Sequence, residues 1–283
     1  MAQFFSDDPE KTLQIAGQQA DDEVSLFPTA LAFGALTAPR DSATPYLEHL
    51  RILAEETASR YETLLTNQAK DTAGTQLVAL KHVLHDSHGY ALDPIPRNLT
   101  YSTNLIHTID RRKGTPETLG ILYLCTARAL EWDMEALSFP YAFIGRIEKG
   151  PEHLLFDPAQ GCKIMNAPDL RALAKAIAGP RTELSATYYS PLTIRALLIR
   201  LQNILKFHQI AEHEYESALI TIHALQAFAP TEYKFFLESG VLYAKTGQKD
   251  NAILALETYI TRAPSAKERY EAELFLTQLT DKL

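Results

Sequence analysis

Three positions between Arg111 and Gly161 decide what chemistry this chain of 283 residues can do. In a Cys–His–Asp hydrolase or acyltransferase, a thiol lies at a helix N-terminus, an imidazole on an adjacent strand takes its proton, and a carboxylate orients the imidazole. The stretch reads RRKGTPETLGILYL, SFPYAFIGR and LLFDPAQG, which predicts a helix followed by two strands. The three positions hold Pro116, Ala142 and Asp157. Only the carboxylate is present, so we predict no catalytic residue among them.

Three other residues follow one another along the chain in the order of the triad, but we do not expect them to form one. Cys125, His153 and Asp157 follow one another correctly, but Cys125 falls within an apolar helical segment, where burial raises a thiol pKa. His153 and Asp157 are four residues apart on one predicted strand, a separation of roughly 13 Å. Cys162 follows Gly161 and is either an exposed thiol or a small turn residue, and the second interpretation is favoured. A cysteine-dependent hydrolase or acyltransferase with an unorthodox residue set remains the alternative function.

Two further groups of residues have a chemical and a structural interpretation. His82, His85 and His88 are spaced by three, so a metal site is conceivable, but a solvated helix face is favoured and we expect no metal and no cofactor. The basic run Arg111–Lys113 precedes a capped helix and could hold an anion or an acidic partner. Instead of anion or partner binding, we favour the pairing of at least one of these arginines with a core carboxylate such as Asp157 or Asp110.

The elements that must position these residues are mostly helices. Helical spacing covers 45–64 and 74–85, with Thr44 as the expected N-cap of the first helix. Thr115 is expected to cap a helix that has Pro116 in its first turn and ends near Leu130. Short segments rich in aliphatic and aromatic residues over 134–157 predict a three-stranded antiparallel sheet, and 166–178 returns to helix. The first domain is therefore predicted to be α+β.

A polar segment bracketed by Gly and Pro, 179–191, is the predicted boundary between domains 1–185 and 190–283. Beyond it the sequence is helical and repeats, since Ala218 and Ala252 are 34 residues apart, as are the Ala–Pro pairs at 229–230 and 263–264. This is the period of tetratricopeptide repeats. Small residues at Gly240 and Ala252 would let paired helices approach closely, and 266–283 would form the last helix.

Composition limits the class of protein. The formal net charge of −8 argues against a nucleic-acid partner, which requires a basic face. No apolar run is long enough to span a membrane, and the first residues do not have the pattern of a signal peptide. Two cysteines cannot form a disulfide framework, which favours a cytoplasmic protein.

The same residues resemble a known family: bacterial transglutaminase-like proteins with C-terminal tetratricopeptide repeats, often called invasion-regulator homologues. The segments that carry the resemblance are DRRKGTPETLGILYL, the SFP turn, FDPAQG and ESGVLYAKTG. The resemblance implies an α+β, transglutaminase-like (papain-like) helical core with a small antiparallel sheet, followed by an all-α tetratricopeptide-like domain. Gly114 and Pro116 match the family's Gly–x–Pro, and Asp157 matches its strand-end carboxylate. The family's usual Gly–His pair is replaced by Tyr141–Ala142.

These observations predict a non-catalytic scaffold or protein-interaction protein. Its partner would be a protein or peptide bound by the helical repeat, with no nucleic acid and no membrane involved. The sequence indicates no particular oligomeric state.

Overall fold

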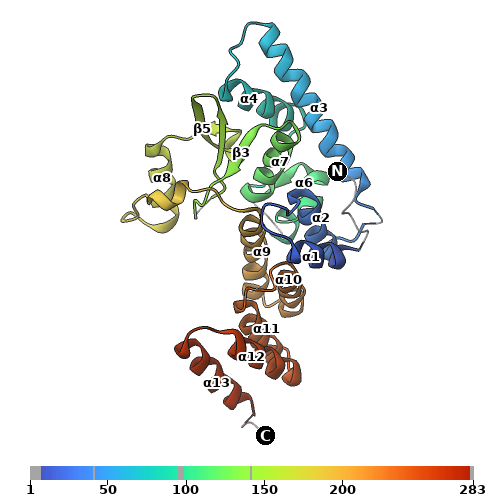
Figure 1. The fold of residues 1–283 in the computed structure, drawn as a ribbon, viewed down its shortest axis with the longest axis vertical. Helices are drawn as coiled ribbons and strands as arrows, with labels where there is room; N and C mark the ends of the chain where they lie inside the picture. Colours follow the sequence, from blue (N-terminus) through green and yellow to red (C-terminus); the bar gives the residue numbers. More distant parts are fainter. Residues whose placement is uncertain (1–7, 41, 95–98, 141, 281–283) are drawn as a thin grey trace. The chain divides into compact units, whose positions relative to one another are not determined.

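The computed structural model describes residues 8–40, 42–94, 99–140 and 142–280. These residues form two compact units (Figure 1). One unit spans Asp21–Leu201, and the other combines the N-terminal residues up to Ala20 with the chain from Gln202 onward. None of the described helices is long and apolar enough to cross a lipid bilayer.

The unit of residues 21–201 is an α+β fold, as predicted. Its helices are α2 (Leu26–Thr37), α3 (Thr44–Thr66), α4 (Ala73–Leu80), α5 (Leu99–Ser102), α6 (Leu105–Arg111), α7 (Pro116–Ala129) and α8 (Ala167–Ala178). The short π-helix η1 (Lys81–Ser87) continues α4, and the 3₁₀ turns η2 (Pro158–Gln160) and η3 (Ala186–Tyr189) lie later in the chain. The expected N-cap at Thr44 is wrong, because Thr44 is already helical and Ala43 is the cap residue.

Helix α7 is the central element of this unit, and its start was predicted correctly. The Thr115 hydroxyl accepts the backbone N–H of Thr118, and Pro116 occupies the first helical position. Most of α7 is buried, and a Cβ atom at Gly120 would lie 2.5 Å from atoms of the Phe143 ring. The segment before β4 therefore packs directly on the α7 backbone, where only glycine fits.

The main sheet has four antiparallel strands rather than the three expected. Its order is β3 (Asp133–Ala136), β4 (Gly145–Lys149), β5 (Glu152–Asp157) and β6 (Lys163–Ile164). The fourth strand is only two residues long and exposed, so it has no hydrophobic pattern by which a sequence could reveal it. A separate parallel pair joins β1 (Ala91–Leu92) to β2 (Lys113–Gly114).

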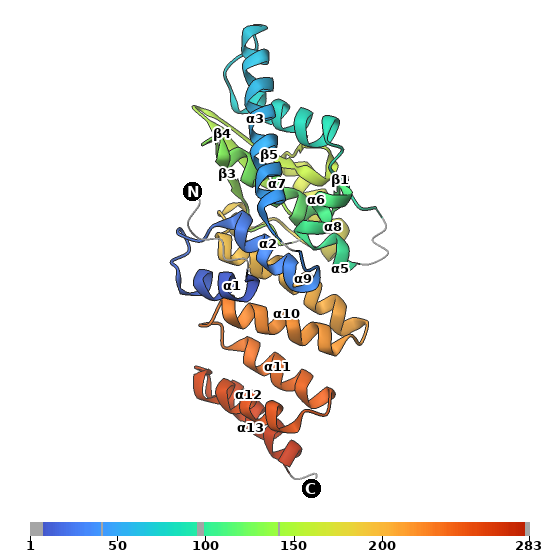
Figure 2. The same cartoon turned by 90° about the vertical axis from the view of Figure 1, so that its right-hand side faces the viewer.

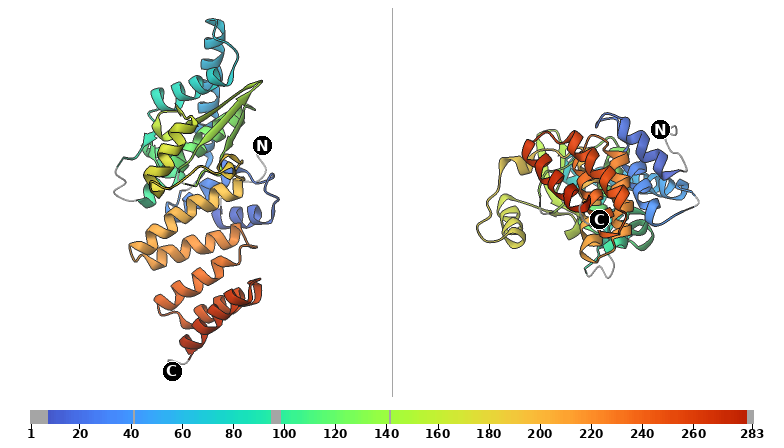
Figure 3. Two further views of the ribbon diagram at one scale, coloured as in Figure 1. Left: turned by 90° about the vertical axis from the view of Figure 1, so that its left-hand side faces the viewer. Right: turned by 90° about the horizontal axis from the view of Figure 1, so that it is seen from below.

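The other unit is helical. It contains α1 (Pro9–Gln18), the second part of α9 (Ile194–Ala211), α10 (Tyr215–Phe228), α11 (Lys234–Lys245), α12 (Lys249–Arg262) and α13 (Ala266–Thr280). Helices α10 to α13 follow one another as a stack (Figures 2 and 3). Ala218 and Ala252 are fully buried, and a Cβ atom at Gly240 would lie 2.9 Å from Leu256 Cγ. The expected last helix ends at Thr280 within the described residues.

The division between the units differs from the predicted domain ranges. Segment 179–191 has the composition of a linker, but its end is hydrogen-bonded to the edge of the sheet. Ser138 N donates to Ser190 O, and Leu192 N donates to Ala136 O, at 2.8 and 2.7 Å. These bonds hold the segment in the first unit, so the division falls within α9, after Leu201.

Candidate functional site

The three triad positions lie on elements that meet at one end of the β4–β5 ladder. Gly145 at the start of β4 pairs with Phe156 near the end of β5, so the segment that carries Ala142 and the strand end that carries Asp157 share an edge of the sheet. Pro116 is the first residue of α7, and α7 contacts the turn η2 that follows Asp157. Tyr141, the other residue that replaces the family's Gly–His pair, is outside the described residues.

Asp157 directs its carboxylate into its own turn. Oδ1 accepts the backbone N–H of Ala159 at 2.9 Å, and Oδ2 accepts the side-chain amide of Gln160 at 2.7 Å. The residue is only 4% exposed, and burial raises the pKa of its carboxyl, although these two hydrogen bonds favour the charged form. Asp157 thus acts as the cap of η2, which is a structural use of the carboxylate.

Ala142 is a packing residue. It is partly buried against an apolar cluster that includes Phe139, Ile144 and Leu170, the last of these from α8. Its methyl group can neither donate nor accept a proton. The position that the chemistry assigns to an imidazole therefore precedes β4 rather than lying on a strand, and it packs against the apolar cluster.

Gly114, two residues before Pro116, packs closely against a cluster of threonine side chains. A Cβ atom at Gly114 would lie 2.3 Å from Thr118 Oγ1 and 2.7 Å from Thr108 Cγ2. The two threonine hydroxyls are 3.1 Å apart, and Thr118 Oγ1 also donates to Ser102 O. Close packing at the helix start therefore explains the glycine of the Gly–x–Pro sequence.

A buried ion pair lies beside the position of the missing thiol. Glu117 is 5% exposed, and its carboxylate accepts a hydrogen bond from Arg200 Nη2 at 3.2 Å. The other terminal nitrogen of Arg200 donates to Phe139 O at 2.5 Å. Arg200 thus links the first turn of α7 to the SFP turn. No local pattern in the sequence predicts this pair, because 83 residues separate its members.

Neither cysteine is placed as a nucleophile. Both are free and buried, and burial raises the pKa of each thiol to about 12. His153 is exposed on β5, opposite Glu148 of β4, whereas Asp157 is buried at the end of the same strand. The alternative triad of Cys125, His153 and Asp157 therefore combines a protonated buried thiol with an imidazole on the surface.

Comparison of the sequence with known protein families identifies the family of this part of the chain. The sequence profile of the transglutaminase-like superfamily matches residues 44–203. The chain belongs to this superfamily. It is also 24% identical to a UPF0162 protein of Xylella fastidiosa over 248 residues, which cover 87% of this chain and 86% of that protein. A UPF0162 protein of Vibrio cholerae is 23% identical over 260 residues, covering 91% and 92% of the two chains.

A shorter match has higher identity. A UPF0162 protein of Pseudomonas aeruginosa is 34% identical over 104 residues, which cover 36% of this chain and 37% of that protein. No solved structure is significantly similar to the chain. The matches to the Xylella and Vibrio proteins thus extend over both units, while the match to the transglutaminase-like superfamily ends within α9.

The three histidines of this transglutaminase-like chain lie on and just after the π-helix η1. His85 Nδ1 is 2.8 Å from Asp86 Oδ1, and His88 Nε2 is 2.6 Å from Glu56 Oε2 on α3. Within the described ranges, no group of three or more His, Cys, Asp or Glu side chains is arranged to hold a metal ion. Two of the three histidines, His85 and His88, thus pair with carboxylates.

The basic run makes structural contacts, but with different partners from those expected. Arg111 lies 3.5 Å from Asp93, while Asp110 pairs with Arg40 at 3.0 Å. Arg112 has a left-handed φ of 59° and caps the C-terminus of α6. An arginine of the run therefore pairs with a carboxylate, but this is Asp93 rather than Asp157 or Asp110, because the oxygens of Asp157 bind its own turn.

Arg112 also belongs to a partly buried network that the sequence did not reveal. Its Nη1 lies 2.7 Å from His49 Nε2, which is 2.8 Å from the hydroxyl of Tyr90, and Arg112 also donates to that hydroxyl. Burial and the charges of Arg112 and His88 lower the pKa of His49 to about 4. His49 is therefore neutral near pH 7 and accepts hydrogen bonds at Nε2.

Proposed function

We propose that this transglutaminase-like protein is a non-catalytic scaffold that binds a protein or peptide partner. The observation that carries the proposal is the structural use of all three triad positions. Pro116 starts a helix, Ala142 packs against an apolar cluster, and the oxygens of Asp157 cap a turn. A transfer or hydrolysis reaction would require a nucleophile and a base at the first two positions.

The state of the thiols supports the same proposal. A thiol with a pKa of about 12 holds very little thiolate near neutral pH, and the thiolate is the reactive form. Two free, buried cysteines also fit a reducing compartment, so the proposed location is the cytoplasm.

The helical unit supplies the proposed binding surface. Helices α10 to α13 alternate with short turns, and the small residues Ala218, Gly240 and Ala252 stand where tetratricopeptide-like helix pairs need close approach. Stacked helix pairs expose extended surfaces that bind peptides. We therefore place partner binding in this unit.

Affinity capture with the full chain tests the proposal. Wild-type protein and Asp157→Asn would be compared in native lysate of the source bacterium, with quantification of the captured proteins by mass spectrometry. The scaffold proposal expects at least one protein to be enriched equally by both. Enrichment of no protein by either chain, or loss of the partner from a folded D157N chain, would count against it.

A further inference from the structure

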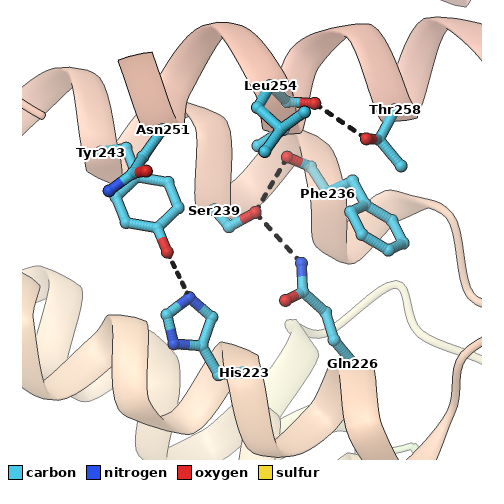
Figure 4. A pocket seen from close by; sticks show the side chains of 9 residues that line it. His223, Gln226, Phe236, Ser239, Tyr243, Asn251, Leu254 and Thr258 are labelled. Carbon is cyan, nitrogen blue, oxygen red and sulfur yellow. Dashed lines mark hydrogen bonds between the residues drawn. The ribbon is translucent and has the colours of Figure 1, made fainter. Parts of the chain in front are cut away.

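A cavity opens between two helices of the helical unit. It has a volume of about 180 Å³, with walls from α10 and α12 and a floor from α11. Ser239 lies at the bottom and is 1% exposed, while Leu254 at the rim is 64% exposed. Figure 4 shows the lining side chains converging from the three helices.

Ser239 is the residue that keeps this space open. Leu205 lies 34 residues upstream, at the equivalent position of the preceding helix pair, and is buried there at 4% exposure. The short serine side chain leaves room that a leucine would occupy. Its hydroxyl donates to Phe236 O at 3.1 Å and accepts from Gln226 Nε2 at 3.1 Å, so the floor of the cavity is fixed.

Two primary amides face the cavity from opposite walls. Gln226 on α10 donates from Nε2 to Phe235 O and Ser239 Oγ, and Asn251 on α12 donates from Nδ2 to Gln248 Oε1. In the part of the chain that the structure describes, no donor bonds to Gln226 Oε1 or Asn251 Oδ1. Both oxygens therefore have acceptor capacity for the N–H groups of a ligand.

The cavity carries no formal charge of its own. No aspartate, glutamate, lysine or arginine is among the described residues that line it. Two charged groups of opposite sign act on lining residues: Glu10 acts electrostatically on His223, and Arg262 stacks 4.6 Å from the centre of the Phe236 ring while it donates to Pro230 O. A neutral lining favours an uncharged ligand over a phosphate or an isolated carboxylate or ammonium group.

The volume of the cavity further limits the class of ligand that it can bind. Sites for small molecules and cofactors typically enclose roughly 300–1,000 Å³. A cavity of about 180 Å³ is too small for most of these but suits one side chain of a polypeptide. Binding energy at protein interfaces is commonly concentrated in such an anchor residue in a pocket.

We infer that this cavity binds a partner polypeptide in an extended conformation. One uncharged aliphatic or aromatic side chain enters between Ser239 and Leu254, and the N–H groups of the adjacent peptide bonds donate to Gln226 and Asn251. The inference rests on the proposed scaffold function and names its binding surface.

The test uses the full chain and a phage-displayed library of random linear peptides. Enriched sequences are synthesised with a fluorophore, and their affinities are measured by fluorescence anisotropy. We expect them to share one aliphatic or aromatic anchor residue and to bind Ser239→Leu at least about tenfold more weakly than wild type. Leucine is already accommodated at the equivalent Leu205, so this variant fills the cavity with a side chain that the helix pair tolerates.

Two further variants make the result independent of folding. Asn251→Ala truncates an exposed side chain and should also weaken binding about tenfold. Glu257→Gln, an exposed position of α12 outside the cavity, is the matched control and should bind like wild type. The inference is overturned if no sequence is enriched, if the shared anchor is charged, or if enriched peptides bind the S239L and N251A chains as tightly as wild type. Such a failure, together with a captured partner in the lysate experiment, would leave the scaffold proposal intact and move the binding surface elsewhere.

Discussion

Two regions of the molecule contain polar groups but use them differently. One is the triad edge, which is formed by Pro116, Ala142 and Asp157, and the other is the cavity between α10 and α12. At the triad edge, Asp157 is bonded to its own turn and Glu117 to Arg200. In the cavity, amide oxygens of Gln226 and Asn251 remain available as acceptors. A polar group whose hydrogen bonds are satisfied within the chain stabilises the fold, whereas one with spare capacity beside an open space can recognise a ligand.

The largest expected effect concerns the ion pair at the triad edge. Arg200→Met should lower the free energy of unfolding by about 3 kcal/mol, because it leaves the buried Glu117 carboxylate without its partner. Urea denaturation monitored by circular dichroism measures the change. The double variant Glu117→Gln/Arg200→Met should recover most of the loss, and a single variant as stable as wild type would contradict a structural role for the pair.

A smaller effect is expected at Asp157. Asp157→Ala should cost about 1–2 kcal/mol, because the N–H of Ala159 loses its acceptor. Asp157→Asn should stay within about 0.5 kcal/mol of wild type, because the asparagine oxygen still caps the turn and the exposed Gln160 amide can turn to accept from the asparagine NH2 group. Thermal unfolding of the two variants checks this. If the asparagine chain were as unstable as the alanine chain, the negative charge and not the cap would be the important property.

The His49 network predicts a pH dependence of stability. His49 has a pKa of about 4 in the folded chain against 6.5 ordinarily, so between these values the unfolded chain binds more protons. Stability should therefore fall as the pH drops from 6.5 towards 4. The loss attributable to His49 is about 1 kcal/mol, after allowance for its partial solvation. His49→Gln keeps an acceptor but does not titrate. The difference in the free energy of unfolding between wild type and this variant, measured by urea denaturation at pH 7 and at pH 4.5, should therefore isolate the effect of His49. An equal pH dependence in both chains would refute the assignment.

The smallest expected effect on the free energy of unfolding concerns the cavity. Ser239→Leu should change the free energy of unfolding by less than about 1 kcal/mol, since the gain from filling the cavity offsets the lost hydrogen bond from Gln226. Thermal unfolding checks this value. A loss of several kcal/mol would mean that the serine is part of the core rather than the floor of an open site.

Local signals in the sequence predicted the parts of the fold that local chemistry determines. Thr115 followed by Pro116 indicated the start of α7, and Asn166 with Pro168 indicated the start of α8, where the structure has a capping box with Asp169. The strands β3, β4 and β5 were visible from their aliphatic residues. Each of these signals lies within a few residues of the feature that it predicts.

The remaining features depend on contacts between distant residues. The pairing of Glu117 with Arg200 and the bonds of Ser138 and Ala136 to segment 190–192 have no local signature, so both the ion pair and the division within α9 were missed. The cavity at Ser239 was missed for a related reason, because an empty space is defined by helices that converge in three dimensions.

The rate at which the two cysteines react with iodoacetamide tests whether this transglutaminase-like protein is non-catalytic. In the folded full chain near pH 7.5, site-resolved mass spectrometry should show Cys125 and Cys162 alkylated about a hundredfold more slowly than in a urea-unfolded sample. The physical reason is their raised pKa and their burial. The rate should also rise linearly with reagent concentration. Fast, saturable alkylation of either cysteine in the folded chain would contradict the non-catalytic role and indicate that this cysteine is a reactive nucleophile.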